Sequence, residues 1–185
     1  MIGKLMIVTG PMFAGKTTAL LSAASRYPAD RIRIFKPKID VRYSKQAVVS
    51  HTGEQIPAIL IDQDCPDLLS SLAGNTQAIF IDELNFFDFD SLSPQIEAVR
   101  AKNIEVFGYG LSYDFAKNPF GATLSLIAKA DSVLSLQAIC DGCGKPAKHS
   151  YRKKKMDEYL VIGGAELYGA CCQACWRELA QGRVK

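Results

Sequence analysis

The sequence predicts an α/β fold with a mostly parallel sheet. Over residues 1–138, short β-branched runs alternate with helical stretches, a pattern typical of βαβ units. The apolar runs that begin at Leu5 and Ala78 do not alternate with polar residues, as expected for strands covered on both faces. A length of 185 residues suits one compact domain with a small additional unit.

The expected elements follow one another in strand-helix order. Strands are expected at residues 5–9, 31–35, 78–81, 105–108 and 132–136. Helices are expected at residues 17–27, 67–72 and 123–130. A further helix is expected to begin near Ser93 as its N-cap, with Pro94 as its first helical residue. Residues 36–57 are less regular and are compatible with a small hairpin.

The composition of the chain changes after residue 138. Cysteine, glycine, lysine and tyrosine become frequent there, which predicts a core at residues 1–138 and a small C-terminal unit at residues 139–185. The formal net charge is +3, and basic side chains outnumber acidic ones only in the C-terminal unit. This charge is too small to indicate a nucleic-acid-binding protein by itself.

Composition and hydropathy exclude several other classes of protein. Hydrophobic residues make up 48% of the chain and charged residues 22%, which argues against a disordered or fibrous protein. No apolar stretch approaches the ~20 residues needed to span a bilayer, and the run from Leu5 to Val8 is too short for the core of a signal peptide. We therefore expect a cytoplasmic location, where cysteines do not normally form disulfides.

The first chemical motif is a phosphate-binding loop. Gly10-Pro11-Met12-Phe13-Ala14-Gly15-Lys16-Thr17 matches G-x-x-x-x-G-K-[ST] and lies between an expected strand and an expected helix. The glycines allow backbone N–H groups to point at phosphate oxygens, and the helix N-terminus adds a positive dipole. Lys16 is expected to reach the outer phosphates, and the Thr17 hydroxyl to bind Mg²⁺. A chance glycine turn is the less favoured interpretation.

The second motif is an apolar strand that ends in two carboxylates. Asp82 and Glu83 directly follow the expected strand at residues 78–81, as in a Walker B segment. Ligands of open parallel sheets bind at the carboxyl ends of the strands, so these carboxylates are expected to face the phosphates held by Lys16. Neighbouring side chains of a strand point to opposite faces, so one carboxylate can serve Mg²⁺ while the other accepts a proton from a hydroxyl or water. A solvated acidic strand end is the alternative.

The third motif consists of two C-x2-C pairs, Cys140 with Cys143 and Cys172 with Cys175. Four thiolates of this kind can surround Zn²⁺ tetrahedrally, and such a closed site is structural because it has no open position for catalysis. Cys171 is a competing ligand, but choosing it would turn the second pair into C-x3-C. We therefore prefer Cys172, and expect Cys171 and Cys65 to be buried or free thiols. Four unligated core cysteines are the alternative.

Two further segments lie between the cysteine pairs. Arg152-Lys153-Lys154-Lys155 is a basic run, which favours a solvated loop over a nucleic-acid-binding patch because aromatic residues are sparse around it. Val161-Ile162-Gly163-Gly164 ends in paired glycines, which fit a loop whose backbone approaches another group closely.

Together these residues resemble the type II thymidine kinases, the zinc-containing family built on a RecA-like P-loop core. The resemblance covers nearly the whole chain. Besides the four cysteines, the matching segments are Gly10 to Thr18, Lys36-Pro37 with Asp40 and Arg42, Ser50-His51 with Gly53, Asp82-Glu83 with Phe86-Phe87, Gly110-Leu111 with Asp114-Phe115, Phe120-Gly121, and Val161 to Gly164 with Tyr168.

The resemblance implies a RecA-like core followed by a small zinc-ribbon and lasso unit. It also implies transfer of the ATP γ-phosphoryl group to the 5′-hydroxyl of thymidine or deoxyuridine. Glu83 is expected to be the general base, and Asp82 to lie near Mg²⁺. Arg42 is expected near the transferred phosphate, and Thr18, Asp40 and Asn85 are also assigned to the ATP side of the site.

The nucleoside contacts are likewise implied by the resemblance. The family pattern assigns ten residues to contacts with the base and the sugar or to the lasso that covers them. They are Met12, Leu111, Phe115, Phe120, Ser150, Val161, Ile162, Gly163, Gly164 and Tyr168. The lasso reads the pyrimidine largely through its backbone and is held at both ends by structural Zn²⁺. Family members favour a homotetramer, and the expected partners are the nucleoside and ATP, with no nucleic acid and no membrane.

Two positions depart from the family pattern. Asn85 stands where many members have glutamine. Ser150 stands where a threonine usually faces the 5-methyl group of thymine, and a lost methyl contact is worth about 1 kcal/mol.

Two other classes of function compete with this prediction. In one, a zinc-containing, DNA-associated ATPase uses the phosphate loop to drive motion. In the other, a nucleotide-binding scaffold has no turnover, which is disfavoured by the presence of Lys16, Thr17, Asp82 and Glu83 together.

Overall fold

The computed structural model describes residues 1–40, 47–49, 53–154 and 156–180. Its centre is a six-stranded sheet in the order β5-β2-β6-β7-β1-β8, and all neighbouring strands of this sheet pair in parallel. The strands are β1 (Leu5–Thr9), β2 (Ile32–Pro37), β5 (Ile59–Ile61), β6 (Ala78–Ile81), β7 (Glu105–Gly110) and β8 (Ser132–Ser135). The predicted α/β class with a mostly parallel sheet is confirmed.

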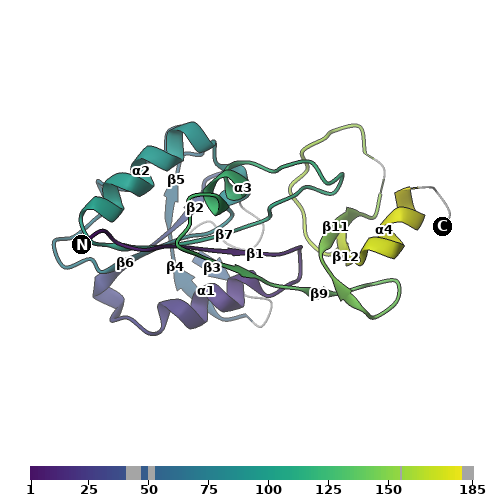
Figure 1. Ribbon diagram of the computed structural model, residues 1–185, viewed down its shortest axis with the longest axis horizontal. Coiled ribbons are helices and arrows are strands. Elements are labelled where there is room, and N and C mark those ends of the chain that lie inside the picture. Colours follow the sequence, from purple (N-terminus) through teal and green to yellow (C-terminus); the bar gives the residue numbers. More distant parts are fainter. Residues whose placement is uncertain (41–46, 50–52, 155, 181–185) are drawn as a thin grey trace.

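Helices cover both faces of the sheet. Figure 1 shows α2 (Phe89–Ala101) and α3 (Ala122–Ile127) on one face, and α1 (Lys16–Ala24) on the other. The strands β3 (Ala47–Val49) and β4 (Gln55–Pro57) lie on the same side as α1 and form an antiparallel hairpin, as predicted for the irregular region. Two short 3₁₀ helices, η1 (Ala29–Arg31) and η2 (Leu84–Phe86), connect elements of the core.

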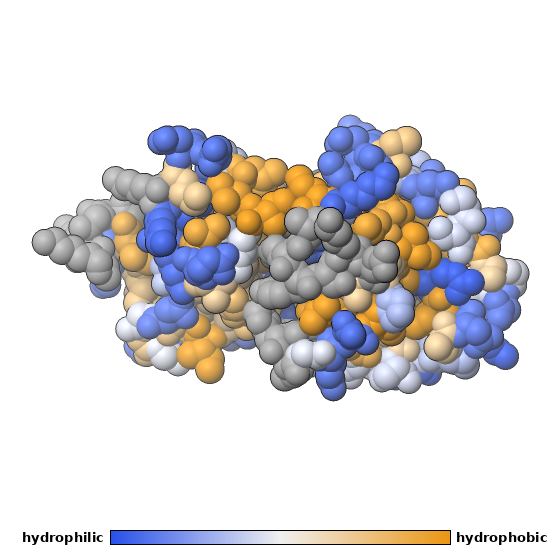
Figure 2. Space-filling model, turned by 180° about the vertical axis from the view of Figure 1, so that it is seen from behind, coloured by the Kyte–Doolittle hydropathy of each residue, from blue (hydrophilic) through white to orange (hydrophobic). Residues whose placement is uncertain are grey.

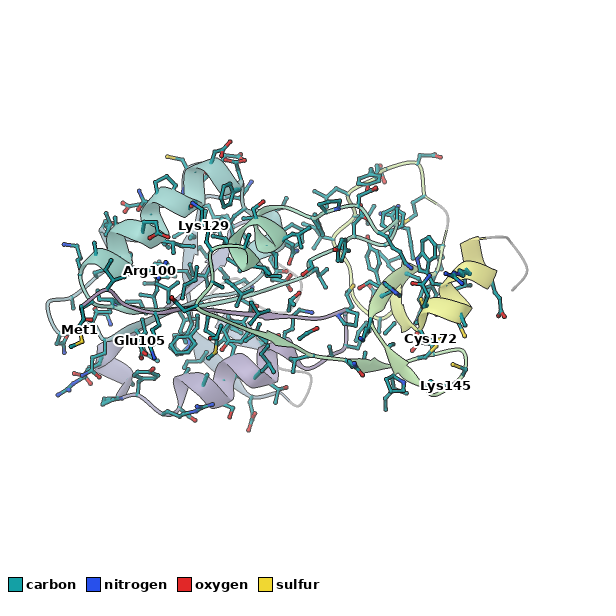
Figure 3. All side chains as sticks on the ribbon, in the orientation of Figure 1. Met1, Arg100, Glu105, Lys129, Lys145 and Cys172 are labelled. Atoms are coloured by element: carbon teal, nitrogen blue, oxygen red, sulfur yellow. The ribbon has the colours of Figure 1, made fainter. Side chains whose placement is uncertain are left out.

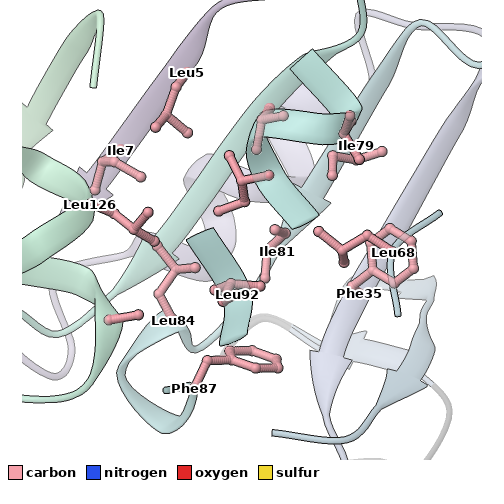
Figure 4. Close-up of a cluster of buried hydrophobic side chains, with 14 of the residues drawn as sticks. Leu5, Ile7, Phe35, Leu68, Ile79, Ile81, Leu84, Phe87, Leu92 and Leu126 are labelled. Atoms are coloured by element: carbon pink, nitrogen blue, oxygen red, sulfur yellow. The ribbon is translucent and has the colours of Figure 1, made fainter. Parts of the chain in front are cut away.

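Alternate side chains of the strands fill two separate hydrophobic layers. Leu5 and Ile79 pack with residues of α2 such as Leu92 (Figure 4). Val8 and Phe80 lie on the opposite face of the sheet and pack with residues of α1. The strands are therefore apolar along their whole length because both of their faces are buried. Their carboxyl ends meet at one edge of the sheet, which is where the predicted motifs lie.

Two helices were predicted at the wrong positions. No helix forms at residues 67–72, because the Asp67 carboxylate accepts the backbone N–H of Ser70 at 3.0 Å and stabilises a turn instead. The helix expected to begin at Ser93 begins at Phe89, because Asp88 is its N-cap and accepts the Ser91 N–H at 2.9 Å. Pro94 consequently lies inside α2 rather than at its first turn.

Other differences concern shorter pieces. α1 and α3 end three residues before the predicted positions, and both chain segments continue in tight i to i+3 hydrogen-bonded turns. The short strand β5 was not predicted. It pairs with β2 at the edge of the sheet, directly after the region whose sequence pattern is least regular, and it is only three residues long.

The C-terminal part contains two small antiparallel sheets and a helix. β9 (Ala138–Ile139) pairs with β10 (Pro146–Ala147), β11 (His149–Arg152) pairs with β12 (Tyr168–Cys171), and α4 (Gln173–Ala180) follows. It has its own hydrophobic cluster, against which Ala14 of the phosphate loop packs. The division of the chain at residues 138 and 139 stays a prediction.

The surface is not uniformly polar. On the face opposite to that of Figure 1, hydrophobic residues form a band across the middle of the molecule, between hydrophilic groups (Figure 2). None of the helices in the described ranges has the length and apolar character that a bilayer crossing requires.

Candidate active site

The loop between β1 and α1 wraps around the side chain of Lys16. Its Nζ atom donates hydrogen bonds to the carbonyl oxygens of Gly10 at 3.0 Å and Pro11 at 2.8 Å. Gly15 is the N-cap of α1 and has φ 82°, a left-handed conformation that glycine adopts without a steric penalty. The sequence therefore folds here as a phosphate-binding loop whose lysine and helix N-terminus face the same side.

A cleft opens in front of this loop, with a space of about 780 Å³ that includes the part open to solvent. We call it the loop cleft. Its lining contains both predicted oxygen donors, Thr17 and Asp82, together with Lys16. The remaining lining residues are Met12, Phe13, Gly15, Thr18, Lys36, Asp40, Ala47, Val48, Val49, Glu83 and Leu111. A hydroxyl and a carboxylate are ligands that suit Mg²⁺, so this donor set fits the predicted ion.

Asp82 and Glu83 follow β6 and differ in their environment. Asp82 is 7% exposed, and its Oδ1 atom accepts the backbone N–H of Glu83 at 3.0 Å. Burial and the nearby Asp82 carboxylate raise the pKa of Tyr109. Glu83 has φ 52° and ψ 48°, a left-handed conformation that is uncommon for a residue with a side chain. Glu83 is the N-cap residue of η2, and both carboxylates line the loop cleft.

A buried ion pair forms another wall of the loop cleft. Lys36 and Asp40 are 3% and 4% exposed, and Lys36 Nζ lies 3.4 Å from Asp40 Oδ2. Asp40 was predicted on the phosphate side, and it lies in this lining. Lys36 belonged to a recognised motif but was not predicted as a site residue. Arg42, with Ser50 and His51, lies outside the described residues.

A second cavity, which we call the apolar pocket, encloses about 540 Å³, including the part open to solvent. It lies between the core and the C-terminal part. Its lining contains nine of the ten predicted nucleoside contacts, namely Met12, Leu111, Phe115, Phe120, Ser150, Val161, Ile162, Gly163 and Tyr168. Gly164 is not in the lining, but it is buried next to it. Residues far apart in the sequence thus form one pocket.

The loop cleft and the apolar pocket share a wall. Met12, Glu83 and Leu111 line both cavities. A molecule in the apolar pocket and one in the loop cleft therefore meet beside the Glu83 carboxylate. This arrangement suits the transfer of a group between two bound molecules.

Hydrogen bonds hold that wall in place. The Ser150 hydroxyl of β11 accepts the backbone N–H of Met12 at 3.0 Å, which joins the phosphate loop to the C-terminal part. Asn85 is 2% exposed, and its Oδ1 atom accepts the backbone N–H of Leu111 at 2.9 Å. Asn85 was predicted on the phosphate side; it lines the apolar pocket and is not among the residues of the loop cleft.

The glycine pair after Ile162 closes the apolar pocket. A Cβ atom on Gly163 would lie 2.4 Å from Leu167 Cδ1, so a larger residue here would displace the Leu167 side chain. Gly164 donates its N–H to Glu166 Oε1 at 2.7 Å, and its carbonyl accepts the Tyr168 N–H at 3.0 Å. These contacts make a tight turn that leads back into β12.

Four sulfur atoms meet at the far end of the C-terminal part. The Sγ atoms of Cys140, Cys143, Cys172 and Cys175 all lie within 4.8 Å of one another. Those of Cys143 and Cys172 are 3.7 Å apart, close to the ~3.8 Å expected for two thiolates of a tetrahedral zinc site with Zn–S bonds of about 2.3 Å. The donor set therefore fits Zn²⁺. Figure 3 shows Cys172 at the start of α4.

The two remaining cysteines lie outside this cluster. Cys171 is 1% exposed and belongs to the hydrophobic cluster of the C-terminal part, whereas Cys65 is exposed. Cys171 is the last residue of β12, whereas Cys172 lies between β12 and α4, where its Sγ atom joins the four-sulfur group.

Several pocket residues were not predicted as site residues. They are Phe86, Asp114, Tyr159 and Leu160 in the apolar pocket, and Lys36 with three hairpin residues in the loop cleft. Phe86, Asp114 and Lys36 stood within recognised motifs, which was a usable signal. The hairpin and Tyr159 carry no such signal, because only the folded chain brings them to the cavities. Within the phosphate loop, Gly10, Pro11 and Ala14 do not line the loop cleft; the first two accept hydrogen bonds from Lys16.

Comparison with known proteins identifies relatives over almost the full chain. The family model described as Thymidine kinase matches residues 3–176. The thymidine kinase of Pseudothermotoga lettingae is 34% identical to this chain over 183 residues, which cover 97% of this chain and 98% of that relative.

Proposed function

Because the chain belongs to the thymidine kinase family, it is an ATP-dependent kinase of thymidine, and we propose that the apolar pocket binds the nucleoside while the loop cleft binds ATP. The transferred γ-phosphoryl group would pass to the 5′-hydroxyl at the wall that the two cavities share. Deoxyuridine, which lacks only the 5-methyl group of thymidine, is proposed as a second substrate.

One observation carries this proposal: Glu83 lines both cavities. A general base must lie within hydrogen-bond reach of the proton that it removes, and here it must also adjoin the accepting phosphoryl group. A carboxylate on the shared wall fulfils both conditions. We therefore propose Glu83 as the base that accepts the proton of the 5′-hydroxyl as that oxygen attacks the γ-phosphorus.

The residues of the loop cleft are proposed to neutralise and orient the phosphates. Lys16 and the N-terminus of α1 supply positive charge on the side from which the phosphates enter. Thr17 and Asp82 would hold Mg²⁺, which when bound neutralises charge on the phosphate oxygens. Arg42 is proposed to steady the transferred group, and Asp40, paired with Lys36, to hold this side of the cleft.

The nucleoside is proposed to lie with its base among the apolar side chains of Leu111, Phe115 and Phe120. Tyr168 forms the sugar side of this pocket, and its hydroxyl donates to the Val161 carbonyl at 2.6 Å. This bond orders the backbone of the residues that would read the pyrimidine edge. Flat apolar walls with a few fixed polar groups are typical of such binding pockets.

Zinc is proposed to be structural, bound by the four clustered cysteines. It would tie the turn between β9 and β10 to the beginning of α4. The Trp176 indole of α4 donates its N–H to the Phe115 carbonyl at 3.3 Å. Zinc would therefore support the nucleoside pocket from outside without touching the reacting atoms.

The DNA-associated ATPase is disfavoured by the family to which the chain belongs. We further propose a homotetramer in the cytoplasm that acts on small molecules, in line with the family resemblance and with the modest net charge of +3.

Replacing Glu83 by glutamine tests the proposal directly. Glu83→Gln keeps the size of the side chain and removes its basicity, so turnover of thymidine should fall by roughly 10²-fold or more. Binding of ATP and thymidine, measured by calorimetry, should change little. Glu178→Gln, an exposed substitution on α4, is the matched control and should keep parental turnover. Turnover within a fewfold of the parent in Glu83→Gln would exclude Glu83 as the base.

A further inference from the structure

A polar contact joins the loop that follows β7 to the segment that covers the apolar pocket. The Tyr159 hydroxyl donates a hydrogen bond to Asp114 Oδ2 and accepts one from Asn118 Nδ2 at 2.8 Å. The ring of Tyr159 also packs on Phe115, with the ring centroids 5.4 Å apart. We call Asp114, Asn118 and Tyr159 the latch, and residues 156–164 the cover segment.

The acceptor side of the latch is held by hydrogen bonds within the core loop that do not involve Tyr159. Asp114 is 7% exposed, and its Oδ1 atom accepts the backbone N–H groups of Ala116 at 2.8 Å and Asn118 at 2.9 Å. Its Oδ2 atom accepts a hydrogen bond from Asn118 Nδ2 at 3.4 Å and also faces the cover segment, where it accepts one from Tyr159. Because these bonds fix the carboxylate, binding the phenol orders few additional groups in the core.

The donor side belongs to the cover segment itself. Tyr159 is 58% exposed although it lines the apolar pocket, so it is not part of a hydrophobic core. Arg152 donates to the carbonyl oxygens of Glu158, at 2.9 Å, and of Tyr159, and its guanidinium lies 4.0 Å from the centre of the Phe115 ring. Arg152 thus shapes the backbone around Tyr159, and the latch then attaches this backbone to the core.

We propose that Tyr159 is a positioning residue that keeps the cover segment closed over the nucleoside and so sets how long the nucleoside stays bound. This inference rests on the proposed function, because it requires the nucleoside to occupy the apolar pocket. The cover segment supplies Tyr159, Leu160, Val161, Ile162 and Gly163 to that pocket. Losing the latch would lower the fraction of molecules with a closed pocket, and the apparent nucleoside affinity would fall in proportion to that closed fraction. The loop cleft shares no residue with the cover segment, so ATP binding would not change.

Tyr159→Phe removes the latch hydroxyl and keeps the ring that packs on Phe115. A hydrogen bond to a charged acceptor is the stronger kind, so we expect the KM and Kd of thymidine to rise up to about tenfold. The thymidine dissociation rate should rise by the same factor, while the KM of ATP stays within twofold and kcat does not fall. Tyr113→Phe is the matched control, since Tyr113 lies on the same core loop, is 46% exposed and lines neither cavity.

Phe120→Ala separates failure of the latch from failure of the pocket, because Phe120 lines the apolar pocket outside the latch. If Phe120→Ala loses thymidine binding while Tyr159→Phe keeps parental values, the latch is wrong and the proposed pocket stands. If neither variant changes thymidine binding, the pocket assignment itself fails. An equal rise of the thymidine and ATP KM values in Tyr159→Phe would show a general structural effect and would also overturn the latch.

Discussion

Replacing Ser150 by threonine is expected to increase the preference for thymidine over deoxyuridine. Ser150 lies on β11, is 5% exposed and lines the apolar pocket, and its hydroxyl accepts the Met12 N–H at 3.0 Å. Threonine keeps this hydroxyl and suits a strand, where β-branched side chains are well tolerated. The substitution therefore adds one methyl group at the wall proposed to face the 5-position of the base.

The size of the change in specificity follows from the apolar area that the added side-chain methyl group and the 5-methyl group of thymine would together remove from water. One buried methyl or methylene contact contributes about 0.8 kcal/mol, which corresponds to a change of about fourfold in an equilibrium or specificity ratio. Deoxyuridine has no 5-methyl group to contact, so its kinetic constants should remain near parental values. The gain should therefore appear almost entirely in thymidine.

Measurement of kcat/KM for both nucleosides gives the ratio directly. Ser150→Ala is the informative comparison, because it removes the acceptor of the Met12 N–H and leaves a partly buried donor unpaired. That loss costs about 1–3 kcal/mol. It should lower kcat/KM for thymidine and for deoxyuridine alike, because Met12 lines both cavities and its displacement affects the site whichever nucleoside is bound. An unchanged ratio in Ser150→Thr, with normal activity on deoxyuridine, would refute the placement of Ser150 beside the base methyl group.

Three further outcomes test other parts of the molecule. Metal analysis should find one Zn²⁺ per chain, lost in Cys172→Ser and kept in Cys171→Ser; loss in Cys171→Ser alone would reverse the assignment. Asp88→Ala removes the N-cap of α2 and should lower the free energy of unfolding by about 1 kcal/mol in urea titrations, and an unchanged midpoint would contradict the role of this cap. Gly163→Ala brings a methyl group against Leu167 and should raise the KM of thymidine but not of ATP; equal effects on both would argue against a cover over the nucleoside.

The strands were predictable because burial on both faces leaves a direct mark on the sequence. β1 and β6 were predicted at their observed bounds, since their apolar runs have no polar interruption. α2 was misplaced because the Ser-Pro signal at residues 93 and 94 competes with the Asp88 cap five residues earlier. The stronger determinant was the packing of Leu92 and other α2 residues on the sheet, which a local signal does not contain.

The same distinction holds for the site. Cys140 with Cys143 and the loop around Lys16 are local motifs, so their spacing alone indicated their chemistry. Tyr159 was missed because its meaning depends on Asp114, which is 45 positions away in the chain and reaches it only through the fold. Val48 was missed for a similar reason. It lines the loop cleft because it belongs to a hairpin whose position the sequence pattern did not fix.

The position of Met12 suggests that the two substrates are coupled through the backbone of the phosphate loop. Its neighbour Pro11 accepts a hydrogen bond from Lys16 on the ATP side, while its own N–H donates to Ser150 on the nucleoside side. This bond of 3.0 Å, beside the packing of Ala14 on the C-terminal hydrophobic cluster, is a route by which bound phosphates that displace the loop would also displace β11. Interactions of this kind are reciprocal, so ATP should alter thymidine affinity by the same factor by which thymidine alters ATP affinity. Breaking the bond in Ser150→Ala should reduce that factor towards one. Calorimetric titration of thymidine with and without a non-hydrolysable ATP analogue, and of the analogue with and without thymidine, measures the factor. An undiminished factor would place the coupling elsewhere, at Glu83 or Leu111 on the shared wall.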